Sequence, residues 1–140
     1  MTAALDTNVI AALWDASDAL HISARKALDA VWSREQLVIS GVVYAELVGA
    51  PERTEAFVDQ FCEETGIAVE WELAEKIWRS AGKAFQEYAA RRKKQSGGEP
   101  RRILADFLIG AHAVVNGYKL LTLDARLYRA AFPQLKVETV

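Results

Sequence analysis

Short apolar runs alternate along the chain with longer stretches in which apolar residues recur every three or four positions. The short runs predict buried strands at residues 2–5, 37–40, 67–69, 118–123 and 135–137. The longer stretches predict helices over about residues 8–14, 18–34, 40–48, 51–64, 72–92 and 101–115, and a last short helix that carries Leu127 and Ala131. Parallel strands need long crossovers, which pack as helices on both faces of a sheet. We therefore predict an α/β fold of three layers, with a short parallel sheet of four to five strands flanked by helices.

Size and composition fit one compact domain over residues 1–140. Of the 140 residues, 51% are hydrophobic and 26% are charged, an ordinary balance for a single core. No apolar run approaches the roughly 20 residues of a membrane span, and no signal peptide is visible, so we expect a cytoplasmic protein without membrane association. Cys62 is the only cysteine, which excludes an intrachain disulfide and leaves oxygen and nitrogen as ligands for any metal.

The net charge of −2 is unevenly distributed. Residues 91–102 hold six Lys or Arg against one Glu, a net charge of +5 that leaves −7 for the rest of the chain. One interpretation is a basic edge that attracts phosphate beside an acidic centre that collects cations. The commoner explanation of such a run is a solvated helix end.

Four acidic residues occupy positions that favour a shared site. Asp6 and Asp124 follow predicted strands at their carboxyl ends, where parallel sheets bind ligands. Glu46 and Asp106 lie inside predicted helices, and their neighbours three and four positions away are mainly apolar or small, with Arg102 as an exception near Asp106. We therefore expect the carboxylates of Glu46 and Asp106 to face inward.

Inward-facing carboxylates are unfavourable unless they are paired or bound to a cation, because desolvation penalises the charged form. Four such groups close together also repel one another unless a cation lies between them. Mg²⁺ or Mn²⁺ prefers carboxylate and water oxygens and can activate a bound water. The four acids therefore predict a site for a hard divalent ion.

Each acid also has a structural explanation when it is taken alone. Asp6 and Asp124 can be N-caps of the helices that follow them, and Glu46 and Asp106 can lie at the boundary of amphipathic helices. Four independent accidents explain the joint placement less well than one site does. The histidines are poor catalytic candidates, because His112 is six positions after Asp106, on another face of the helix, and His21 is expected at the surface.

Four segments in order resemble the motifs of PIN-domain ribonucleases, and specifically of the VapC toxins of VapBC toxin–antitoxin pairs. They are LDTNVI from Leu5, ISGVVYAEL from Ile39, ADFLIGA from Ala105 and LTLD from Leu121. A single LDTN is common by chance, whereas four motifs at these spacings are specific and span nearly the whole chain.

The resemblance implies a PIN fold, an endoribonuclease that depends on Mg²⁺ or Mn²⁺, a VapB-type antitoxin that inhibits the site, and a homodimer. It implies that the four acids bind the metal or orient its water, and that Thr7, Asn8 and Thr122 hydrogen-bond within the site. It also makes the basic stretch, which is more basic than we expect of this family, a candidate for RNA binding through Arg91, Arg92, Lys93, Lys94, Arg101 and Arg102.

Other functional classes fit less well or stay open. A phosphatase of the haloacid dehalogenase type needs a second Asp two residues after the first, where this chain has Asn8, and Lys119 lies at the wrong end of its strand for a phosphorylatable receiver domain. Two alternatives stay open: a non-catalytic metal-binding interaction protein on the same fold, and a housekeeping PIN nuclease without an antitoxin.

Overall fold

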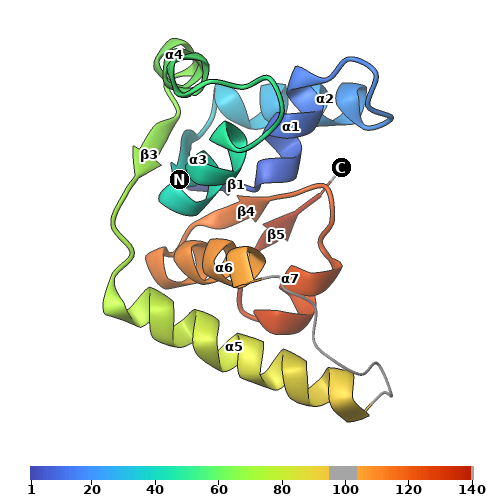
Figure 1. Cartoon of the computed structure of the whole chain (residues 1–140), viewed down its shortest axis with the longest axis vertical. Coiled ribbons are helices and arrows are strands. Elements are labelled where there is room, and N and C mark those ends of the chain that lie inside the picture. Colours follow the sequence, from blue (N-terminus) through green and yellow to red (C-terminus); the bar gives the residue numbers. More distant parts are fainter. Residues whose placement is uncertain (95–103, 140) are drawn as a thin grey trace.

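The structure of the chain is a computed structural model that describes residues 1–94 and 104–139 (Figure 1). In this part of the chain, one five-stranded sheet has the order β3-β2-β1-β4-β5, and each neighbouring pair is parallel. The strands are β1 (Thr2–Leu5), β2 (Gln36–Ser40), β3 (Ala68–Glu70), β4 (Lys119–Leu121) and β5 (Val137–Glu138). The predicted α/β fold and parallel sheet are confirmed.

Helices cover both faces of the sheet. Figure 1 shows α1, α2 and α4 on one side and α5, α6 and α7 on the other, and α3 packs against both α1 and α6. The described helices are α1 (Thr7–Trp14), α2 (His21–Trp32), α3 (Gly41–Val48), α4 (Glu55–Thr65), α5 (Glu75–Lys94), α6 (Leu104–Asn116) and α7 (Arg126–Ala131). None of the described helices is long and apolar enough to cross a membrane.

The central strand β1 shows why the strands read as continuous apolar runs. Ala3, Ala4 and Leu5 are all buried, because helices cover β1 on both faces. On the side of α5 and α6, the fully buried ring of Phe107 stacks on Phe85, with 5.0 Å between ring centroids. The core therefore lies on both faces of the sheet and fixes the strand ends rigidly.

The order of the strands places a topological switch point at the carboxyl ends of β1 and β4. From β1 the chain builds outward to β2 and β3, and it then crosses back to place β4 on the other side of β1. Crossovers on opposite faces leave an opening between the two central strands, which is where open parallel sheets bind ligands.

Two predicted helix boundaries are wrong for local reasons. The helix predicted from Pro51 begins at Glu55, because Pro51 falls in a turn and Thr54 caps the helix by accepting a hydrogen bond from the Phe57 N–H at 3.1 Å. The helix predicted from residue 18 begins at His21, after the Asp18 side chain accepts the Leu20 N–H at 2.7 Å. The predicted start of the helix over 101–115 lies outside the described residues.

Candidate metal centre

Asp6 is the most firmly held of the four acids. Its backbone N–H donates to the Leu121 carbonyl at 3.0 Å, which ties the end of β1 to the end of β4. Its Oδ1 accepts the Thr7 N–H at 2.7 Å, and its Oδ2 accepts the Thr122 hydroxyl at 2.8 Å. Asp6 is therefore both the N-cap of α1 and a buried acid with a fixed orientation at the switch point. Burial raises its pKa, and the hydrogen bonds from Thr122 and Thr7 offset part of that effect.

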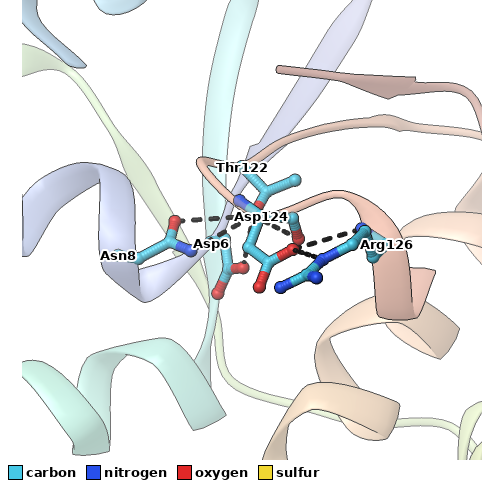
Figure 2. Close-up of polar contacts among 5 residues, drawn as sticks. All are labelled: Asp6, Asn8, Thr122, Asp124 and Arg126. Carbon is cyan, nitrogen blue, oxygen red and sulfur yellow. Dashed lines mark hydrogen bonds and ion pairs between the residues drawn. The ribbon is translucent and has the colours of Figure 1, made fainter. Parts of the chain in front are cut away.

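Thr122 organises the polar contacts around Asp6, as Figure 2 shows. While its hydroxyl donates to Asp6, the same oxygen accepts Asn8 Nδ2 at 3.3 Å and the Asp124 N–H at 3.2 Å. Asn8 in turn accepts the Leu123 N–H through its Oδ1 at 3.1 Å. Asn8 and Thr122 therefore belong to one hydrogen-bond network with Asp6.

Asp106 enters the site from the first turn of α6 and is half-buried. Burial is the main cause that raises its pKa from 3.8 to about 6, and the negative charges of Asp6, Glu46 and Asp124 add to the effect. The structure thus brings the other three acids within electrostatic range of Asp106. At neutral pH the ionised form of Asp106 is therefore unfavourable in this position, and a cation beside the carboxylate would stabilise it.

Glu46 does not face inward, and that prediction is wrong. The residue is exposed on α3, while Val43 and Leu47 are the members of that helix that pack into the core. Its carboxylate Oε1 accepts the Thr7 hydroxyl at 2.6 Å. Glu46 therefore lies at the rim of the site, where Thr7 holds it, and its apolar helical neighbours do not indicate burial.

Asp124 also lies at the rim, with 59% of its side chain exposed. Its Oδ1 accepts the Arg126 backbone N–H at 3.3 Å and lies 3.5 Å from Arg126 Nε, the contact at the right of Figure 2. The N-cap position of α7 is Ala125, which makes no side-chain cap, and Asp124 instead caps the first N–H of the helix from one residue earlier. Its charge raises the pKa of Asp106 less than the charges of Asp6 and Glu46 do.

Tyr128 is a polar residue of the site that sequence reasoning missed. It is 2% exposed on α7, and burial, followed by the charges of Asp6 and Asp106, raises the pKa of its phenol. The phenol lowers the pKa of both carboxylates, which places it within their reach. The one sequence feature that could have indicated its place in the site is a tyrosine hydroxyl four positions after Asp124.

The remaining candidates are the two histidines and the basic stretch. His112 is buried, with Nε2 at 2.8 Å from Glu70 Oε1, which fits its exclusion from the site. His21 is half-buried and donates from Nδ1 to the Ala12 carbonyl at 2.9 Å. Arg91 and Arg92 are half-buried near the end of α5, whereas the side chains of Lys93, Lys94, Arg101 and Arg102 lie outside the described residues.

The acids suit a hard divalent ion in their chemistry. Within the described residues, no three acidic, histidine or cysteine side chains stand close enough to enclose a metal by themselves. Mg²⁺ commonly binds through one or two carboxylates and keeps several waters, so a closed cage of protein ligands is not required. Asp6 and Asp106 supply two buried or half-buried carboxylates, and the unpaired buried hydroxyl of Tyr128 supplies a donor beside them. Two carboxylate ligands, with the Tyr128 hydroxyl as a hydrogen-bond donor beside them, fit Mg²⁺ or Mn²⁺.

Together, the strand order and the acids define a small parallel α/β protein with an acidic centre at the topological switch point of its sheet. The chain belongs to the PIN domain family, whose model matches residues 3–133. No curated protein matches the sequence.

Solved structures of toxin–antitoxin proteins share this fold. VapBC-1 from nontypeable Haemophilus influenzae is 25% identical over 99% of this chain and 98% of that one, with a TM-score of 0.66. VapBC2 from Rickettsia felis, solved with a DNA fragment from its promoter, is 20% identical with the same coverage and TM-score. VapC20 from Mycobacterium tuberculosis, a toxin that cleaves the sarcin–ricin loop, is 21% identical over 96% of this chain and 98% of that one, with a TM-score of 0.60.

Proposed function

We propose that this protein is a Mg²⁺- or Mn²⁺-dependent endoribonuclease and the toxin of a type II toxin–antitoxin pair. The observation that carries the proposal is the placement of Asp6 and Asp106 at the carboxyl ends of the central strands, where burial, and after it the charges of the other acids, raise the pKa of Asp106. Membership of the PIN domain family and the likeness to VapC20, a toxin that cleaves the sarcin–ricin loop, support the choice of RNA as the substrate.

Asp6 and Asp106 are the acids that hold the metal in this proposal, with Glu46 and Asp124 at the rim to bind its waters. A bound divalent ion supplies an activated water for attack on the phosphodiester and screens charge on the phosphate. Asp6 offers a ligand of fixed orientation, because Thr7 and Thr122 hold one carboxylate oxygen each. Thr7 also donates its hydroxyl to the Glu46 carboxylate and so restrains Glu46 at the rim of the site. No histidine base is required in this proposal, because a metal-bound water is activated by the ion itself.

The proposed partner is a small VapB-type antitoxin that blocks the acidic centre. Support comes from the VapBC complexes with the same fold, including one bound to promoter DNA.

We also propose a homodimer. The exposure of two large apolar side chains, Trp71 at 63% and Trp78 at 52%, leaves apolar surface that a second copy can cover. Light scattering of the purified chain tests the dimer directly.

The decisive test of the function is RNA cleavage by the purified chain with Mg²⁺ or Mn²⁺ and with chelator. We expect cleavage with either metal, none with chelator, and a loss of at least about 100-fold in Asp6→Asn, because a metal ligand and the anchor of the Thr122 network are changed together. Asp29→Asn is the matched control, because Asp29 is an exposed Asp on α2, away from the site. Equal cleavage by Asp6→Asn and Asp29→Asn contradicts the proposal.

The same samples separate the alternative functions. Metal binding without any cleavage of RNA favours a non-catalytic metal-binding protein on this fold. Cleavage by a chain whose expression is harmless, and whose gene has no neighbour encoding a small DNA-binding protein, favours a housekeeping PIN nuclease without an antitoxin.

A further inference from the structure

The Tyr128 hydroxyl is an unsatisfied polar group in the centre of the protein. The residue is 2% exposed, and the oxygen makes no hydrogen bond within the part of the chain that the structure describes. A buried hydroxyl without a partner is unfavourable, and such groups are rare unless they serve a purpose. A phenylalanine at this position fills the same space without that penalty.

Three separate elements converge on this hydroxyl. Tyr128 lies on α7, and the two carboxylates that act on it most strongly are Asp6, at the end of β1, and Asp106, in the first turn of α6. Because α7 packs against α6 and Tyr128 belongs to the core, the ring is held in place, and its hydroxyl lies near enough to Asp6 and Asp106 to interact with both carboxylates. A protonated phenol in this position can only donate to a carboxylate, since ionised carboxylates are acceptors without a proton to give.

We propose that Tyr128 is a positioning residue of the metal centre, whose hydroxyl donates a hydrogen bond to the Asp6 or Asp106 carboxylate and holds it in the orientation that binds the divalent ion. The inference rests on the proposed metal-dependent function and deepens it. Donors behind a ligating carboxylate fix its direction and increase its affinity for the metal. In this centre Thr7 and Thr122 already hold Asp6, so the hydroxyl has its larger effect on Asp106.

The test is Mn²⁺ binding by the full chain, measured by titration calorimetry for the original protein and for Tyr128→Phe. Phenylalanine keeps the ring and removes only the hydroxyl. We expect Mn²⁺ to bind Tyr128→Phe about 10-fold more weakly or worse, as for other residues that support metal ligands. The unfolding midpoint in chelator should change little, because the ring and its packing in the core are kept.

Tyr118→Phe is the matched control. The Tyr118 hydroxyl donates to Glu70 Oε2 at 2.8 Å, and the charges that raise the pKa of Tyr118 come from Glu70 and from none of the four acids. Its loss should lower the unfolding midpoint and leave Mn²⁺ affinity unchanged. The pair therefore separates a change in stability from a change in the metal centre.

Three outcomes distinguish the explanations. Weaker Mn²⁺ binding by Tyr128→Phe but not by Tyr118→Phe supports the positioning role. Equal Mn²⁺ affinity of Tyr128→Phe and the original chain overturns it, including the case in which only the KM for RNA rises and the hydroxyl contacts substrate instead. If the original chain itself fails to bind Mn²⁺, the proposed metal-dependent function fails together with this inference.

Discussion

Replacing Asp106 by Asn should stabilise the metal-free protein while it abolishes metal-dependent activity. The substitution keeps the shape of the side chain and removes a charge that the fold disfavours. Burial and the charges of Asp6, Glu46 and Asp124 raise the pKa of this carboxyl from 3.8 to about 6. The ionised form is therefore less favourable in the folded chain than in the unfolded one.

The magnitude follows from that pKa. Each factor of ten in acidity corresponds to about 1.4 kcal/mol, so a change from 3.8 to about 6 corresponds to about 3 kcal/mol. Because Asp106 is only half-buried, solvent screening reduces the effect, and we expect about 1–2 kcal/mol.

The sign of the pH dependence is fixed by linkage. Between pH 4 and pH 6, the folded chain binds more protons at Asp106 than the unfolded chain does, because the folded pKa is about 6. The penalty is therefore fully present above about pH 6, and it disappears as the pH falls toward 4.

Urea denaturation in chelator measures the free energy of unfolding of both proteins. At pH 7.5 Asp106→Asn should be the more stable by about 1–2 kcal/mol, and the difference should vanish near pH 4. A variant that is less stable than the original chain at pH 7.5 refutes the reasoning, because the carboxylate is then a net stabilising group in the absence of metal.

Two further substitutions, one of them with a matched control, test the hydrogen bond that orients Asp6 and the close packing of the core. Thr122→Val removes the hydroxyl that donates to Asp6, and it should destabilise the chain by about 1–3 kcal/mol in urea denaturation and weaken Mn²⁺ binding by about 10-fold in calorimetry. Unchanged Mn²⁺ affinity would show that Asp6 does not need this anchor. Gly110→Ala should destabilise by about 1–3 kcal/mol or more, because its Cβ would lie 2.4 Å from the Phe132 ring, whereas Gly82→Ala, with nothing within 4 Å, should be neutral or stabilising. Equal unfolding midpoints for the two alanine variants contradict the close packing at Gly110.

The sequence predicted the sheet well because its strands are buried on both faces. Such strands form short apolar runs. A run such as residues 2–5 can therefore be predicted as a strand from its own residues, without information on the elements that pack against it. The alternation of strands and helices then placed Asp6 at the carboxyl end of the sheet. Its interpretation as a helix cap is confirmed, because one carboxylate oxygen accepts the Thr7 N–H, while the other oxygen accepts the Thr122 hydroxyl.

Glu46 shows where pattern reasoning fails. The helix α3, with the sequence GVVYAELV, is apolar almost all round, so the residues beside Glu46 carry no contrast between an inner and an outer face. In such a helix the neighbours three and four positions away cannot say which side is buried, and packing against α1 and α6 decides it. Asp106 lies on a longer helix, and the prediction that it faces the interior agrees with its half-buried position.

Tyr128 shows a second limit of the sequence. The helix α7 is only six residues long, too short for a periodic pattern to identify its inner face. The surroundings of the hydroxyl depend on how α7 docks against α6, so its approach to Asp6 and Asp106 belongs to tertiary structure and could not be predicted locally.

The most direct test of the central claim is the position of Mn²⁺ in crystals of the chain, located from its anomalous scattering. We predict a peak at the carboxyl ends of β1 and β4, in contact with the carboxylates of Asp6 and Asp106 directly or through one water, and its loss in Asp106→Asn. A chain saturated with Mn²⁺ that shows no peak there, or that binds the ion at another place, contradicts the assignment of these acids as the metal centre.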